Sequence, residues 1–262
     1  MILIRILTSV LALGLTASAT QSFSNTGTTS GWDSFSIEHS GTVDQVSNVV
    51  YEGSTAIKVT QTYDSSYTGR YHSECVHNAG YKRGQTAFYG FAFRLSESWE
   101  FDEQSFNLAQ WIADFTDTGC DDWMPSSMIW IVGDQLYSRV KYGTICAQQT
   151  STYKNLATVS AGVWHRVVVQ ADWQSDTTGY YKLWLDGVKV LEEYNLATTI
   201  ADDREFSFRV GLYANGWHDQ GKMLGSQPFR QVWYDEIAIG TAFADVDPAQ
   251  WKREAKALPF EA

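Results

Sequence analysis

Cysteine, proline and basic side chains are scarce in this sequence of 262 residues. Three cysteines cannot replace a hydrophobic core with a disulfide framework. Charged residues make up only 19% of the chain and aromatic residues 15%, the opposite of the composition that keeps a chain disordered. The 19 basic against 30 acidic side chains give a net charge of −11, which argues against nucleic acid as a general partner because phosphates would be repelled. A polyanion could bind only in a locally basic cleft.

Long apolar runs and several catalytic motifs are also missing. No His-x-x-x-His, Cys-x-x-Cys, Gly-x-Ser-x-Gly or P-loop spacing occurs, which argues against zinc hydrolases, α/β-hydrolases and nucleotide-binding enzymes. The one apolar run, residues 6–15, is too short to span a membrane. It follows Arg5 and precedes small residues, the layout of a secretory signal over residues 1–19. We therefore expect a secreted, extracellular protein without a membrane span.

Secretion permits disulfides, but three cysteines leave one over. Cys120 and Cys146 flank a Trp-rich segment, and we expect them to pair. Cys75 lies inside a predicted strand, so we expect it to be a free, buried thiol.

Apolar and polar residues alternate with a period of two along most of the chain. Clear examples are residues 56–60, 88–94, 166–170, 206–210 and 233–239. Asp186-Gly187 lies between two such runs and predicts a two-residue hairpin. Many short strands without a linker or repeat predict one antiparallel β-jelly-roll sandwich over residues 20–262, concanavalin-like, with a concave groove suited to a polymer.

Four predicted strands carry polar groups that could line that groove. Alternation places Arg70, His72 and Glu74 on one strand face, and an ionisable face of this kind is not a core face. Gln110 interrupts an otherwise apolar strand, so its amide needs partners or points into a cleft. The remaining two strands supply the pairs Arg139 with Lys141 and Arg209 with Tyr213. Basic groups gathered in an acidic protein are what a groove for an acidic polymer requires.

These segments resemble the signature strands of jelly-roll polysaccharide lyases, related to alginate and heparin lyases. The counterparts are Arg70 to Glu74, Gln110-Trp111-Ile112 and Arg209-Val210-Gly211-Leu212-Tyr213. The segment Tyr71-His72-Ser73-Glu74 is most similar to the fungal glucuronan lyases, polysaccharide lyase family 20. Ile112 stands where related alginate lyases carry a His, which His72 would replace, and Arg209 stands where they carry a Lys. The resemblance thus implies a polyuronate other than alginate, most simply β-1,4-glucuronan.

Such a lyase works by β-elimination, which removes the C5 proton of a uronate and expels the C4 oxygen. Preorganised donors must stabilise the charge that develops beside the carboxylate, and we assign Gln110 to this, with help from His72 and from Arg70 or Arg209. The resemblance implies that Tyr213 is base and acid, with His72 as the alternative base. A phenol has a pKa near 10, and we expect Arg209 or His72 to lower the pKa of Tyr213. The predicted substrate contacts are Arg70, Glu74, Arg139, Lys141 and Arg209.

Asp235 lies on a late strand, where it is either a ligand of a structural Ca²⁺ or an edge charge. No organic cofactor is expected, and the partner is an acidic polysaccharide bound by a monomer.

Two other functions fit the same fold. A carbohydrate-binding module would use aromatic residues such as Trp111 and Trp217, but it would not need Gln, His and Tyr together. A retaining glycoside hydrolase needs two carboxylates about 5–5.5 Å apart, and the usual Glu-x-Asp-x-x-Glu spacing is missing.

Overall fold

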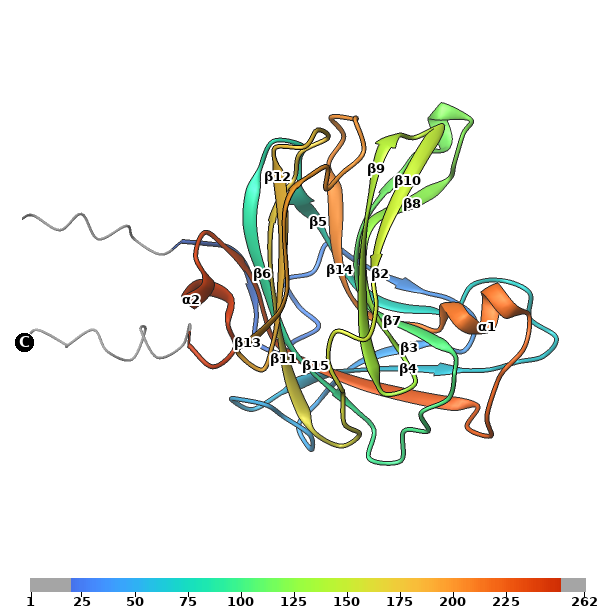
Figure 1. Cartoon of the computed structure of the whole chain (residues 1–262). Coiled ribbons are helices and arrows are strands. Elements are labelled where there is room, and N and C mark those ends of the chain that lie inside the picture. Colours follow the sequence, from blue (N-terminus) through green and yellow to red (C-terminus); the bar gives the residue numbers. More distant parts are fainter. Residues whose placement is uncertain (1–19, 251–262) are drawn as a thin grey trace, which may run out of the picture.

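Alternating side chains divide the strands into a core-facing and an outward-facing row. In β14 (Phe206–Tyr213), Phe208, Val210 and Leu212 enter the core, and Arg209 and Tyr213 lie on the opposite face. The computed structural model describes residues 20–250, and these form two antiparallel sheets packed face to face (Figure 1). The predicted sandwich is confirmed. The predicted secretory signal and the last twelve residues of the predicted domain lie outside the described residues.

Sheet A is the layer that Figure 1 shows with β6, β11, β12 and β13. In spatial order its strands are β13 (Val188–Leu196), β12 (Gly179–Leu185), β11 (Trp164–Asp172), β6 (Thr86–Leu95), β15 (Phe229–Gly240), β4 (Ala56–Thr62) and β3 (Thr42–Val46), with β1 (Gln21–Asn25) paired to β15. The hairpin between β12 and β13 is the predicted one, and both Asp186 and Gly187 have positive φ, as its tight two-residue turn requires.

Sheet B forms the other layer and carries the polar strands. In spatial order its strands are β10 (Ala147–Tyr153), β9 (Gln135–Thr144), β8 (Trp123–Val132), β7 (Ser105–Asp114), β14, β5 (His72–Tyr81) and β2 (Ser34–Ile37). The core between the sheets is rich in aromatic side chains. Trp111 and Trp217 are both in it, so neither is a surface platform for a sugar ring.

Helical structure is minor. The helix α1 (Asn215–Gln220) follows β14 directly, and α2 (Phe243–Val246) lies on the outside of sheet A (Figure 1). A single 3₁₀ turn spans Thr116–Thr118. Between residues 20 and 250, no helix has the length and apolarity that crossing a membrane would demand.

Candidate active site

Three neighbouring strands of sheet B bring the predicted catalytic residues onto one outward face. The register pairs Tyr213 of β14 with His72 of β5, and Arg209 of β14 with Gln110 of β7. Paired residues of adjacent strands point to the same side of a sheet. The sequence pattern therefore placed these four residues on the correct face, although the strands are far apart in the chain.

Tyr213 contacts two of the other predicted site residues. Arg70, just before β5, donates a hydrogen bond from Nη1 to the phenol oxygen of Tyr213 at 2.7 Å. The imidazole of His72 stacks on the phenol ring, with 3.9 Å between ring centroids. Glu38, in the turn after β2, places a carboxylate oxygen 3.3 Å from His72 Nδ1. Arg70, His72 and Tyr213 form the cluster at which a proton could be moved.

The electrostatics of this cluster differ from the expectation. Burial raises the pKa of Tyr213 to about 12, and the Arg70 guanidinium lowers it by less than burial raises it. Asp219 and Glu74 add to the rise. The predicted lowering of the Tyr213 pKa by Arg209 or His72 is therefore wrong, because desolvation of the phenolate dominates and the cation that opposes it is Arg70.

Glu74 lies beneath the cluster rather than on its surface. Its carboxylate is fully buried, accepts a 2.7 Å hydrogen bond from the amide nitrogen of Gln110, and lies 3.7 Å from Nη1 of Arg209. Both oxygens of Glu74 face protein groups, Oε1 the amide of Gln110 and Oε2 the guanidinium of Arg209. The predicted substrate contact of Glu74 is thus replaced by a positioning role, in which one buried charge holds the side chains of Gln110 and Arg209.

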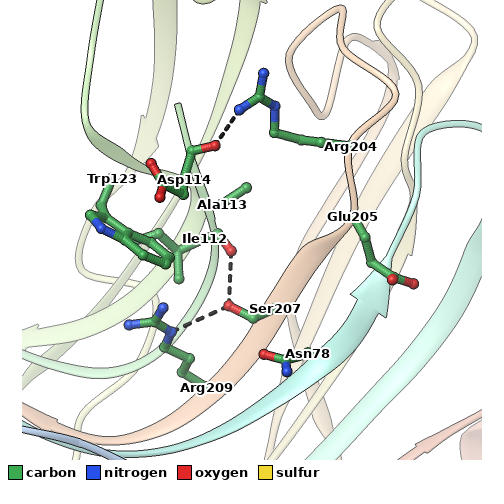
Figure 2. Close-up of a pocket in the computed structure, with 9 residues that line it drawn as sticks. All are labelled: Asn78, Ile112, Ala113, Asp114, Trp123, Arg204, Glu205, Ser207 and Arg209. Atoms are coloured by element: carbon green, nitrogen blue, oxygen red, sulfur yellow. Dashed lines mark hydrogen bonds between the residues drawn. The ribbon is translucent and has the colours of Figure 1, made fainter. Parts of the chain in front are cut away.

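Two adjoining cavities form a groove over this face. One, of about 310 Å³, is lined by Arg70, His72 and Glu38 among others. The second, of about 320 Å³, extends toward Asn78, Glu205 and Ser207 (Figure 2). The residues that line both are Ile112, Trp123 and Arg209, so the two cavities meet there. A groove of two joined compartments suits an extended chain better than a single small molecule.

Trp123 is the functional candidate that sequence reasoning missed. Its side chain is 51% exposed, and the guanidinium carbon of Arg209 lies 4.9 Å from the centroid of its ring. Figure 2 shows the indole facing Arg209 across the cavity, with Arg209 Nε donating to Ser207 Oγ and Ser207 donating to the Ile112 carbonyl. An exposed indole beside a fixed guanidinium offers a uronate ring a stacking surface and a cation. Trp123 lies next to a loop, where no alternation of apolar and polar residues pointed to it.

The end of the groove near Trp123 is fastened by covalent and ionic links. Cys120 and Cys146 form a disulfide that ties the β7–β8 connection to the β9–β10 hairpin. Arg204 donates to the carbonyl of Asp114 at the end of β7 (Figure 2). It also pairs with Asp117 in the connection that follows. Cys75 is a free, buried thiol whose pKa is raised by burial. The loop that presents Trp123 is therefore held at both ends.

Arg139 and Lys141 lie on β9, the third strand from β14. Arg139 donates to the sulfur of Met128, and Lys141 donates to the side-chain oxygen of Gln148 at 2.8 Å. Neither of the two groove cavities is lined by them. Burial lowers the pKa of both, and Arg139 faces the opposing charge of Asp219. Arg139 shares a cross-strand row with Met128 and Gln110, and its charge acts on Tyr213, so it lies beside the catalytic cluster, whereas Lys141 contacts Gln148 instead.

Asp235 lies on sheet A, in the other layer of the sandwich. It is fully buried in β15, which has β6 and β4 as neighbours, so the alternative of an edge charge is wrong. Its carboxylate accepts hydrogen bonds from the backbone N–H groups of Tyr51, Glu52 and Glu236. Within residues 20–250, no three His, Cys, Asp or Glu side chains are grouped so as to hold a metal ion. A cation at Asp235 would need backbone carbonyls for most of its ligands.

Comparison with known proteins extends over most of the chain. The polysaccharide lyase family profile matches residues 24–238. The crystal structure of endo-β-1,4-glucuronan lyase from the fungus Trichoderma reesei is 62% identical, with a TM-score of 0.87, over 88% of this chain and 100% of that one. An alginate lyase of family PL-14 from Aplysia kurodai shares the fold at 9% identity and a TM-score of 0.57, over 86% of this chain and all of that one.

The cellulose-induced protein Cip1 also shares the fold, at 16% identity and a TM-score of 0.50, over 79% of this chain and 90% of that one. No match was found among curated proteins. The match to the family profile covers far more than half of the sequence, as does the similarity to the Trichoderma reesei enzyme. This protein, with its jelly-roll sandwich and a groove lined by Arg70, His72 and Arg209, belongs to the polysaccharide lyase family.

Proposed function

We propose that the protein is an endo-acting β-1,4-glucuronan lyase. The observation that carries this proposal is the 62% identity, over the full length of the other chain, to an enzyme of that name. The groove supports it with the cationic side chains of Arg70 and Arg209, with the hydrogen bond from Arg70 to the phenol of Tyr213, and with an exposed indole next to Arg209. Secretion through residues 1–19 and action as a monomer are further parts of the proposal, tested by N-terminal sequencing of the exported protein and by light scattering.

Elimination assigns one step to each group of the cluster. Arg209 and the second N–H of Gln110 neutralise the carboxylate of the uronate, which makes its C5 proton more acidic. Tyr213, as phenolate, takes that proton, and the C5–H electron pair becomes the C4=C5 double bond. The bond from C4 to the bridging oxygen breaks, and this oxygen takes a proton from the Tyr213 phenol. Tyr213 ends as the phenolate with which it began, so the cycle balances.

His72 and Arg70 prepare Tyr213 for these steps. Arg70 donates its hydrogen bond to the phenol oxygen, which stabilises the phenolate form against the effect of burial. His72 packs flat against the ring and limits its rotation. The Glu38 carboxylate lies 3.3 Å from His72 Nδ1, which helps to hold the imidazole in this orientation.

An ultraviolet assay separates this proposal from the alternatives. Incubation with glucuronan, alginate, heparin and a neutral glucan should give absorbance of an unsaturated uronate with glucuronan first. New reducing ends without absorbance would indicate a hydrolase, and neither signal a binding module.

A tyrosine variant then tests the assigned base. Tyr213→Phe should abolish cleavage and retain polymer binding, whereas Tyr137→Phe, which loses a phenol hydrogen bond to Asn155 on the same sheet, should behave as the parent protein. Cleavage by Tyr213→Phe at the parent rate would transfer the role of base to His72.

We also propose a structural role for calcium at Asp235, remote from the elimination chemistry. Two adjacent, fully buried acidic residues, Asp235 and Glu236, support this, because a cation would neutralise their charge in sheet A. Thermal unfolding in the presence of a chelator and of added Ca²⁺ is the test. A midpoint that is identical in both conditions would remove calcium from the description, without bearing on catalysis.

A further inference from the structure

A third cavity of comparable size lies on the other layer of the sandwich. It has a volume of about 390 Å³ and is built on the outward face of sheet A, between β6, β15 and the segment that follows β3. Its lining residues are Val49, Arg94, Ser96, Glu97, Ser98, Gln231 and Trp233. None of them lines the groove of sheet B. This volume lies in the range of small-ligand sites.

The strand register extends the cavity into a row of side chains across the outward face of sheet A. Trp233 of β15 pairs with Lys58 of β4 on one side and with Arg94 of β6 on the other. Arg94 in turn pairs with Trp164 of β11. The flanking residues of β15, Val232 and Tyr234, belong to the core, so this row faces outward. Basic and indole side chains thus alternate over four adjacent strands, at roughly 4.8 Å per strand.

Two buried donors in this cavity have no acceptor. The side chains of Trp233 and Ser96 are only 9% and 4% exposed, and within residues 20–250 neither Trp233 Nε1 nor Ser96 Oγ has a hydrogen-bond partner. An unsatisfied buried donor costs about 1–3 kcal/mol. A ligand oxygen that entered the cavity would recover part of that cost. Both groups line the space that such an oxygen would occupy.

The guanidinium of Arg94 is held in a fixed orientation in the same cavity. Its Nε donates to the Gly162 carbonyl at 2.8 Å and its Nη2 to Glu97 at 2.7 Å, which fixes the plane of the group. The carboxylate partner Glu97 is 83% exposed, so solvent weakens this ion pair. An ordered guanidinium beside two unsatisfied donors recognises a ligand that is rich in oxygen and carries a carboxylate.

We propose that this cavity and its row form a second, non-catalytic binding site for the uronate polymer. The inference rests on the proposed function for the class of ligand. A uronate ring presents hydroxyl oxygens to Ser96 and Trp233, which have no acceptor, and a carboxylate to Arg94, whose carboxylate partner is exposed to solvent. A polymer held at sheet A remains near the groove of sheet B when a product leaves. Such a second contact raises the effective concentration of substrate. Chains long enough to reach both sites should therefore bind more tightly, whereas shorter chains should not.

Binding and cleavage are measured separately to test this site. Affinity electrophoresis through gels that contain intact glucuronan, with a neutral glucan gel for comparison, is run on the full chain carrying Tyr213→Phe. Arg94→Gln and Trp233→Phe are added singly, and the second change removes the Nε1 donor while it keeps an aromatic ring. The matched control is Arg83→Gln, because Arg83 also pairs with a mostly exposed carboxylate, Asp203 at 84%. Thermal midpoints verify that all variants fold.

Retardation by glucuronan should weaken about tenfold in both site variants and stay unchanged in Arg83→Gln. In the parent background, the ratio of kcat/KM on polymer to kcat/KM on a tetrasaccharide should fall in the same two variants. Unchanged retardation in Arg94→Gln and Trp233→Phe, or an equal loss in Arg83→Gln, would overturn the second site. Absence of unsaturated product from glucuronan would instead refute the proposed function, and the gels would still report on binding at sheet A.

Discussion

The pH dependence of cleavage follows directly from the environment of Tyr213. Burial raises the pKa of Tyr213 to about 12, with Arg70 as the opposing cation. At pH 8 a phenol of that pKa is ionised in about one molecule in ten thousand, and each pH unit multiplies the fraction by about ten. Because kcat/KM reports ionisations of the free enzyme, its logarithm should rise with a slope of about one from pH 7 to pH 9.5.

Replacement of Arg70 should lower the logarithm of kcat/KM at every pH without changing the slope of its dependence on pH. A hydrogen bond to a charged group is worth about 1.5–3 kcal/mol, so Arg70→Gln should raise the pKa of Tyr213 by roughly one to two units. The rate at each pH then falls about ten- to hundredfold. Initial rates of unsaturated product from glucuronan measure both effects, with Arg83→Gln as the control for one lost surface charge. A plateau above about pH 7 would refute the reasoning, because it would identify a base that titrates like histidine.

Three predictions concern the rest of the fold. Glu74→Gln should lower the free energy of unfolding by about 3 kcal/mol, because it leaves Arg209 without its buried partner. Chemical denaturation measures this loss, and an unchanged midpoint would mean that Arg209 is already hydrated. Joint replacement Cys120→Ser with Cys146→Ser should cost about 3–4 kcal/mol by the same method, and a smaller loss would show that the reduced loop stays ordered. The pKa of Tyr153, like that of Tyr213, is raised to about 12 by burial. The folded state therefore keeps protons that the unfolded chain releases above about pH 10. Stability should be constant below pH 10 and fall between pH 10 and pH 12. Unchanged denaturation midpoints across that window would contradict the assigned pKa shifts.

Period-two alternation was sufficient to predict the sandwich and the face of the site. It placed Gln110, Arg209 and Tyr213 outward because their neighbours Trp111, Phe208 and Leu212 are apolar and enter the core. Alternation carries no information on depth, however. It could not show that an ionisable residue in such a row, Glu74, has no exposed surface.

Glu38 and Trp123 are the parts of the site that the sequence did not predict, and both come from segments without a period. Glu38 lies in a turn, and Trp123 lies at the first position after a cross-linked loop. The hydrogen bond between Arg70 and Tyr213 joins residues 143 positions apart. Sequence spacing could suggest that both residues belong to one groove, but only the pairing of β5 with β14 brings them into contact.

The local charge of the groove is more balanced than its basic residues suggest, and this bears on how an acidic protein selects an acidic polymer. Glu74 lies beside Arg209, Glu38 beside His72, and the charge of Asp219 reaches Tyr213. A diffuse positive field is therefore not what attracts the substrate. Glu74 and Glu38 instead hold Gln110, Arg209 and His72 at defined positions, and a uronate is favoured when its own carboxylate and ring oxygens match those positions. Selection by fixed donors is compatible with a net charge of −11, because such donors act over hydrogen-bond distances, at which the remote surface charges are largely screened.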